Sequence, residues 1–227
     1  MIEKSDKEKQ VKSKDRVVNF GEVFTAEREV KAMLDLVKEE SYKVDSRFLE
    51  PACGNGNFLV EILRRKLQTV EEKHSKEYEA FSMLAVGSIY GIDIQKDNCE
   101  ESVERMMSII KDHYLKVNSS EPSELYLKNI QFIMETNIIN GDGLTGMRVD
   151  TGDPIIFSEW TIKGNKVYRV DYEMNEMIKA EKQNTQNKEM SKNGGNLFSL
   201  AGAPVEEVNP KVHKKHRAKS LDKFIGE

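Results

Sequence analysis

Two glycines and an aspartate stand at positions from which a nucleoside could be bound. In "FLEPACGNGNF" (48–58), Gly54 and Gly56 stand between an apolar run and an amphipathic pattern. Glycine allows backbone angles that are closed to other residues and lets a ligand approach the main chain. Asp93 lies in the next apolar run, "YGIDI" (90–94). A carboxylate at such a strand tip can accept hydrogen bonds from ribose hydroxyls.

A further acidic residue, Asp142, follows a third apolar run in "NGDGL" (140–144). Each feature also has a purely structural explanation: a tight turn for the glycines, a helix N-cap for Asp93 and an Asp-Gly turn for Asp142. Three such features at three consecutive strand tips favour a nucleoside-containing ligand. The sequence has no third glycine of a Gly-x-Gly-x-x-Gly motif and no Gly-Lys-Ser/Thr, so it predicts a ligand without phosphates.

Alternating strands and helices would bring these residues together. We expect strands at 47–50 and 88–94, a strand ending near 142, and helices at 57–74, 78–87 and 98–117. This alternation predicts an α/β fold with a parallel sheet and helices on both of its faces. Such sheets bind ligands at the carboxyl ends of their strands. Two apolar runs around Lys-Gly-Asn in residues 154–173 indicate a β-hairpin.

The composition limits the class of protein. The chain has 227 residues, of which 38% are hydrophobic and 33% charged, and its net charge of −4 excludes coating of nucleic acid by charge alone. Two cysteines do not make a disulfide framework. No run has the length and apolarity of a membrane span, so we expect no membrane association and a cytoplasmic location.

Three parts are expected along the chain. Residues 1–16 form a flexible, lysine-rich leader, and residues 17–178 form the folded domain. Residues 179–227 form a polar linker and a basic tail, and the polar, biased stretch 179–197 is expected to be disordered. The basic tail could contact phosphates or be a solvated terminus.

"FLEPACGNGNF" resembles the S-adenosyl-L-methionine motif of the amino-DNA methyltransferases, acidic-Pro-x-Cys-Gly-x-Gly-x-Phe. It is most similar to the N6-adenine enzymes of restriction–modification systems. Upstream, "GEVFTAEREVKAML" (21–34) resembles the segment that precedes this motif in type I modification subunits. "YGIDI" and "NGDGL" fall where the family's second and third cofactor motifs fall. The resemblance covers about residues 20–145 and implies a Rossmann-like class I methyltransferase fold with a mostly parallel sheet.

The resemblance also implies roles for individual residues towards S-adenosyl-L-methionine. Asp93 would hold the ribose hydroxyls, and Asp142 would accept a hydrogen bond from the adenine amino group. Carboxylates near a sulfonium and an ammonium favour the binding of these cations. The methionine end would be bordered by Phe24 and Thr25, and its amino acid and sulfonium would be surrounded by Glu50, Pro51, Cys53, Gly54 and Gly56. No metal is expected.

The resemblance does not extend to the catalytic motif. Methylation of an exocyclic amine requires an aromatic ring that stacks the flipped base and acceptors for its amino group. The family supplies these as Asn/Asp-Pro-Pro-Tyr/Phe after the fourth strand, and the sequence does not contain that motif. "PIIFSEW" (154–160) best fills the fourth-strand position, which makes Glu159 and Trp160 candidates for a substitute site. A lone tryptophan is more often a core residue.

The favoured function is that of an S-adenosyl-L-methionine-binding, adenine-N6 DNA methyltransferase-like protein of a restriction–modification system or mobile element. DNA is the expected partner, reached directly or through a specificity or modification subunit. One alternative is a non-catalytic cofactor-binding subunit, or a decoy that interferes with restriction. A further alternative is a methyltransferase that acts on a small molecule or a protein.

Overall fold

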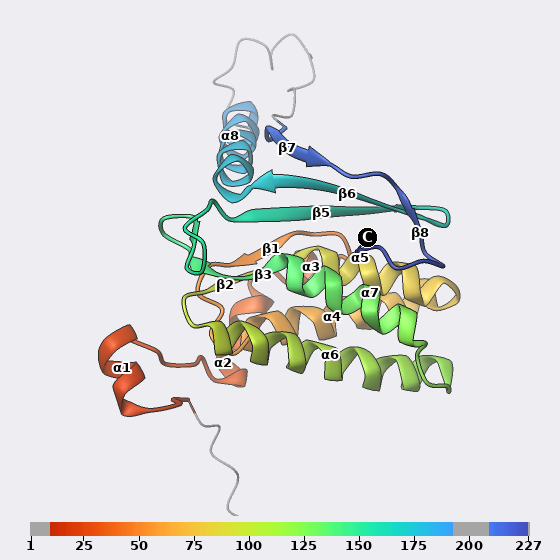
Figure 1. Cartoon of the computed structure of the whole chain (residues 1–227), viewed down its shortest axis with the longest axis horizontal. Coiled ribbons are helices and arrows are strands. Elements are labelled where there is room, and N and C mark those ends of the chain that lie inside the picture. The colour runs from red at the N-terminus through yellow and green to blue at the C-terminus, as the bar shows by residue number, and fades with distance from the viewer. Residues whose placement is uncertain (1–9, 193–208, 227) are drawn as a thin grey trace, which may run out of the picture.

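The structure is a computed structural model, and it describes residues 10–192 and 209–226. Figure 1 shows helices on one side of a small sheet and a second, longer sheet on the other side. Across the described residues, no helix is long and apolar enough to cross a bilayer. The helices are α1 (Lys14–Phe20), α2 (Glu27–Asp35), α3 (Lys38–Tyr42), α4 (Asn57–His74), η1 (Ser75–Glu77), α5 (Tyr78–Gly87), α6 (Lys96–Asn118), α7 (Glu124–Asn137) and α8 (Met174–Lys192). The strands are β1 (Phe48–Glu50), β2 (Ile89–Asp93), β3 (Ile138–Asp142), β4 (Met147–Arg148), β5 (Ile156–Lys163), β6 (Lys166–Glu173), β7 (Val212–Lys215) and β8 (Lys219–Ser220).

The first sheet has the order β1-β2-β3-β4. β1 pairs with β2, and β2 with β3, in parallel, whereas the two-residue strand β4 is antiparallel to β3. All five residues of β2 are buried, as expected of a central strand. The predicted α/β class and the three parallel strands are therefore confirmed, and their carboxyl ends lie at one edge of the sheet.

Helices cover one face of this sheet. α4 begins and ends where the sequence predicted, and its stripe of Leu59, Leu63, Leu67 and Val70 is completely buried. Burial of each such side chain contributes roughly 1.5–3 kcal/mol. This stripe belongs to a core that also contains residues of α2, α5, α6 and α7.

The other face of the parallel sheet differs from the expectation of helices on both faces. A separate cluster joins Ile92 and Ile139 to Phe157 of β5 and Met174 at the start of α8. An antiparallel strand and only the first turns of one helix therefore cover this face. The physical reason is that residues 156–173 bury their own apolar side chains as a hairpin lying on the sheet.

The second sheet has the order β5-β6-β7, with β8 also paired to β6, and all its pairings are antiparallel. β5 and β6 pair from Ile156 with Glu173 to Lys163 with Lys166, around Gly164 at φ +57°. The predicted hairpin is confirmed. The interpretation of 154–160 as a fourth strand of the parallel sheet is wrong, because a two-residue turn holds β5 against β6.

The structure describes only the last part of the expected leader at 1–16. Residues 1–9 lie outside the described part, but α1 already begins at Lys14, and the Ser13 side chain accepts a hydrogen bond from the Arg16 backbone at its N-cap. Arg16 contacts Asp97 on α6 at 2.5 Å, and Lys12 contacts the same carboxylate at 3.0 Å. These ion pairs between residues distant in the sequence hold residues 10–16 against the domain.

The structure likewise describes parts of the expected linker and tail. α8 continues to Lys192, through the first part of the stretch expected to be disordered, and the rest of that stretch lies outside the described residues. The basic tail supplies β7 and β8. These strands pair with β6, and His216 Nε2 lies 2.7 Å from Asp171 Oδ2 on that strand, so backbone pairing and this hydrogen bond attach the tail to the second sheet.

Candidate cofactor site

A cavity of about 570 Å³ lies at the carboxyl ends of β1, β2 and β3, and we call it the cofactor pocket. Its walls come from the segment between α1 and α2, the turn after β1, the tip of β2 and the turn after β3. The structure brings together eight of the nine predicted cofactor residues: Phe24, Thr25, Glu50, Pro51, Cys53, Gly54, Asp93 and Asp142. Gly56 is the exception.

Gly54 and Asp93 connect the first two strand tips. The Gly54 amide donates a hydrogen bond of 2.8 Å to Asp93 Oδ2. Gly54 adopts φ +54°, and a Cβ atom at this position would lie 3.0 Å from the ring of Phe24. Glycine is therefore required here both for the left-handed backbone and for the close approach of an aromatic wall of the pocket.

Asp93 is buried and accepts two more hydrogen bonds. Its Oδ1 accepts from the Gln95 amide at 2.8 Å and from Asn98 Nδ2 at 3.1 Å. An ionised carboxylate has about four acceptor sites, so three described donors leave room for roughly one further hydrogen bond. Asp93 thus both organises the start of α6 and lines the pocket.

Gly56 has a packing role below the pocket. It adopts φ +85°, and a Cβ atom here would lie 2.7 Å from Ser102 Oγ and 3.2 Å from the Ser102 backbone. Ser102 lies on α6 and donates a hydrogen bond to the Gly54 carbonyl at 3.2 Å. The second glycine of the motif therefore lets α4 start close against α6, and Gly56 does not line the cavity.

The pocket is acidic. Glu50 is partly buried at the end of β1, and burial raises the pKa of its carboxyl. Asp142 accepts a hydrogen bond from the Leu144 amide at 2.8 Å, and that bond lowers the pKa of Asp142. Glu22 also lines the cavity, 3.6 Å from Arg16. Among the described residues that line the pocket, four are carboxylates and none is Lys, Arg or His.

Cys53 lies in the wall as a neutral thiol. Its side chain is buried beside Cys99, and the hydrogen bond with Cys99 together with burial raises the pKa of the Cys53 thiol. Because the thiolate is the reactive form, the geometry favours packing over nucleophilic chemistry. The Cys53 amide donates to the Ile92 carbonyl at 2.8 Å, which fixes the turn against β2.

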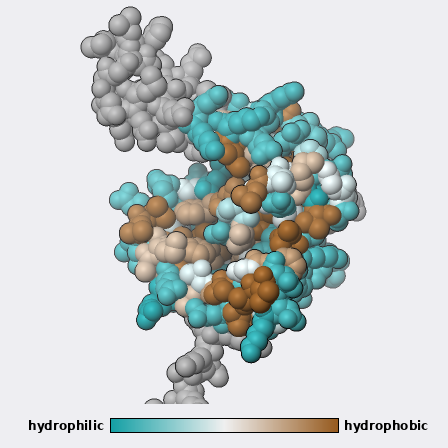
Figure 2. Space-filling view, turned by 90° about the vertical axis from the view of Figure 1, so that its left-hand side faces the viewer, coloured by the Kyte–Doolittle hydropathy of each residue, from teal (hydrophilic) through white to brown (hydrophobic). Residues whose placement is uncertain are grey.

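The rim of the pocket contains residues that the sequence did not single out. Phe20, Ile94 and Leu144 line the pocket, and all three have exposed side chains. Figure 2 shows that apolar patches gather on the face that holds the strand ends. Ile94 follows Asp93 directly, so its position after a strand-tip carboxylate could have indicated it. Nothing in the sequence pattern around Phe20 indicates that α1 folds over this face.

Glu159 and Trp160 lie outside the cofactor pocket. Trp160 is buried in the middle of β5, where its ring packs edge-on against Phe132, with the centroids 6.0 Å apart. A Cβ atom on Gly87 would lie 2.9 Å from Trp160, which shows how closely α5 approaches. Glu159 lies 3.9 Å from Arg47. The structure therefore does not bring the two candidates for base binding together with the predicted cofactor residues.

The fold and the pocket define an α/β protein with an acidic ligand site at the ends of parallel strands. The chain belongs to the MmeI DNA-methyltransferase domain family, whose model matches residues 24–198. This match identifies a DNA methyltransferase of the restriction–modification type and implies a methyl donor and DNA as the substrate. Neither the curated proteins nor the solved structures include a match to the chain.

Proposed function

We propose that this chain binds S-adenosyl-L-methionine in the cofactor pocket and forms the cofactor-binding part of an adenine-N6 DNA methyltransferase. The observation that carries the proposal is the charge of the pocket: four carboxylates line it, without a basic residue among the described lining residues. A dinucleotide or nucleoside triphosphate would place phosphates against these carboxylates. A ligand with a sulfonium and an ammonium gains from the same charges.

The residues present fit this cofactor. Glu50 would attract the ammonium or the sulfonium, because its carboxylate is partly desolvated at the end of β1. Asp93 would accept from one ribose hydroxyl through its remaining acceptor site, and Asp142 would accept from the adenine amino group. When bound, S-adenosyl-L-methionine supplies an electrophilic methyl group. The chain's own residues bind and orient the cofactor.

Transfer to DNA requires a second set of residues. Adenine must be held with its amino group aimed at the methyl donor, and the Asn/Asp-Pro-Pro-Tyr/Phe motif that the family uses does not occur in these 227 residues. Loss of acceptors aligned with developing charge typically lowers turnover by about two to three orders of magnitude. We therefore propose that efficient methylation of adenine needs a partner that supplies the base-binding residues and DNA recognition.

Calorimetric titration tests cofactor binding. The unmodified chain should bind S-adenosyl-L-methionine and should not bind NAD, whose phosphates the pocket repels. Glu50→Gln should weaken binding by about ten- to a hundredfold, the range for a hydrogen bond or contact with a charged group. Glu100→Gln is the matched control, because Glu100 is an exposed residue of α6 outside the pocket. No binding at millimolar cofactor would end the proposal.

A tritium-methyl transfer assay separates the catalytic alternatives. Transfer to adenine in DNA only after addition of a partner would support the proposed function. Cofactor binding without transfer under any condition would favour the non-catalytic subunit or decoy. Transfer to a protein or small molecule, without transfer to DNA, would favour a methyltransferase of another substrate class.

A further inference from the structure

The outer edge of β1 has no partner strand among the described residues. On the inner side, the Phe48 amide donates to the Ser88 carbonyl at 3.0 Å, as part of the ladder with β2. Because successive residues of a strand direct their backbone groups to opposite edges, the N–H and C=O of Leu49 point away from β2. An edge of this kind is a template for pairing with another chain.

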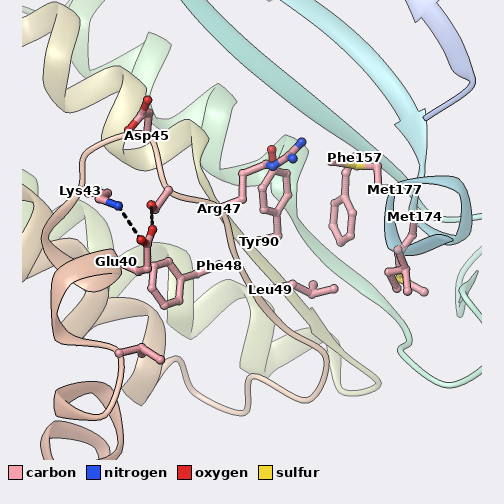
Figure 3. A pocket seen from close by; sticks show the side chains of 13 residues that line it. Glu40, Lys43, Asp45, Arg47, Phe48, Leu49, Tyr90, Phe157, Met174 and Met177 are labelled. Atoms are coloured by element: carbon pink, nitrogen blue, oxygen red, sulfur yellow. Dashed lines mark hydrogen bonds and ion pairs between the residues drawn. The ribbon is translucent and has the colours of Figure 1, made fainter. Parts of the chain in front are cut away.

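This edge forms the floor of a groove with a volume of about 910 Å³, which we call the edge groove. Figure 3 shows Leu49 extended towards Met174, with Phe48 turned towards Glu40 on α3. Leu49 is 38% exposed, although it lies next to the ligand end of a parallel sheet. The wall opposite α3 is apolar and is formed by Tyr90, Phe157, Met174, Met177 and Ile178.

The groove has the features that a strand requires. Strands pair at about 4.8 Å, so an extended segment beside β1 would lie between α3 on one side and β5 and α8 on the other. The backbone groups of Leu49 would supply hydrogen bonds, and the apolar wall would receive side chains. Every open sheet has edge strands, and here the edge strand β1 lines a groove and leads directly into residues of the cofactor pocket.

The next strand of this chain is not available to fill the edge. β5 pairs with β6 over its whole length, from Ile156 to Lys163. In doubly wound sheets, the strand order reverses at the first strand, and the ligand binds beside that reversal. The parallel strands of the described sheet form only the half β3-β2-β1, with the short antiparallel β4 beyond β3, so the position beyond β1 is where the second half of such a sheet would start.

We propose that the edge groove binds a β-strand of another polypeptide, aligned parallel to β1. Parallel alignment places the carboxyl end of the added strand beside Pro51, at the cofactor pocket. The residues that follow this strand would then face the methyl donor, where the missing base-binding motif is needed. This inference rests on the proposed function, and it identifies how the partner completes the site.

The test uses a displayed library of random nine-residue peptides, selected on the purified full chain. Enriched peptides should contain runs of β-branched or aromatic residues without an internal proline, as expected of a strand covered on both faces. N-methylation of successive backbone amides in one enriched peptide should weaken binding at least tenfold at alternate residues only. A benzophenone at the peptide's carboxyl end should crosslink near Pro51, and one at its amino end near Arg47.

Leu49→Pro is the decisive variant. It removes an N–H that points away from β2, so the β1–β2 ladder should remain while peptide binding falls at least tenfold. Leu49→Ala keeps the N–H and should lose much less affinity. If Leu49→Pro does not fold, Leu49→Arg keeps the backbone and places a charge in the groove. Leu115→Ala, at an apolar residue of α6 that is as exposed as Leu49 and lines neither the groove nor the cofactor pocket, is the matched control.

Several results would overturn the proposal. Peptides with apolar residues at helical spacing would mean that the groove binds a helix. A dimer abolished by Leu49→Pro would mean that a second copy occupies the edge. Slow exchange of the Leu49 amide in the isolated chain would mean that the chain covers its own edge, and an absence of enriched peptides would mean that the edge binds nothing. Calorimetry with S-adenosyl-L-methionine separates these results from a failure of the proposed function.

Discussion

Lys66 offers a sharp test of the energetics of this fold, because its ammonium is completely buried on α4. Its Nζ donates to the carbonyls of Lys43 and Ser46 at 3.0 and 2.5 Å, and to Ser88 Oγ at 2.7 Å. A further bond to the Val44 carbonyl measures 3.1 Å. Lys66 thus fixes the segment that leads into β1 and borders the edge groove.

Burial lowers the pKa of Lys66 from 10.5 to about 7. In the unfolded chain the lysine keeps its proton up to about pH 10, so above pH 7 the unfolded state binds more protons than the folded state. Stability must then rise with pH between these values. The difference in bound protons grows from about one half at pH 7 to nearly one at pH 9, which integrates to a gain of about 2 kcal/mol over this interval.

The assay is urea unfolding at pH 6, 7, 8 and 9, followed by the fluorescence of Trp160, the single tryptophan. Lys66→Met removes the titrating group, so the stability of the unmodified chain should rise by about 2 kcal/mol relative to this variant between pH 7 and pH 9. Lys73→Met, at an exposed lysine of the same helix, should show no such difference. A constant difference between the chain and Lys66→Met would refute the reasoning, since it would mean that the oxygen acceptors keep Lys66 charged.

Two further predictions concern the turn after β1 and the attachment of the tail. Gly54→Ala should destabilise the chain in urea unfolding by more than Gly152→Ala. Both positions have positive φ, which costs about 1–2 kcal/mol for alanine, but only an alanine at position 54 would also press on Phe24. Equal losses would contradict a tight contact there. Burial raises the pKa of Asp171, but hydrogen bonds from Arg169, His216 and Ser158 outweigh this effect and lower the pKa. The ionised Asp171 therefore stabilises the attachment of the tail above about pH 4, and this contribution is lost in acid. Asp171→Asn should therefore expose the tail to trypsin at neutral pH, whereas Asp150→Asn, at an exposed ion pair, should not.

The local elements could be predicted from the sequence because local patterns determine them. α4 and α5 have the predicted bounds, since α4 has a clear apolar stripe and α5 is apolar over most of its length. The site also followed from local signals: Gly54 must sit at a strand-to-helix turn, and Asp93 must end the next strand. Parallel pairing then places both at one edge of the sheet.

The errors concern pairing between distant segments. The run that contains Trp160 is apolar whether it joins a parallel sheet or an antiparallel hairpin, and only its pairing with β6 decides between them. The strand in the basic tail depends on contacts such as Asp171 with His216, which are 45 residues apart. The packing role of Gly56 depends on Ser102 of α6, which no local pattern reveals.

The position of the open edge connects the two halves of the proposed activity. Leu49, whose backbone faces the edge groove, immediately precedes Glu50 and Pro51, which line the cofactor pocket. All residues proposed to bind the cofactor come from segments that the chain itself folds, so cofactor binding does not require the added strand. On this proposal base binding does require it, because the base-binding residues would stand on the opposite side of β1 from Asp93. A strand bound at Leu49 would therefore place a new wall beside an existing pocket. If the bound strand changes the affinity for the cofactor by some factor, the bound cofactor must change the affinity for the strand by the same factor.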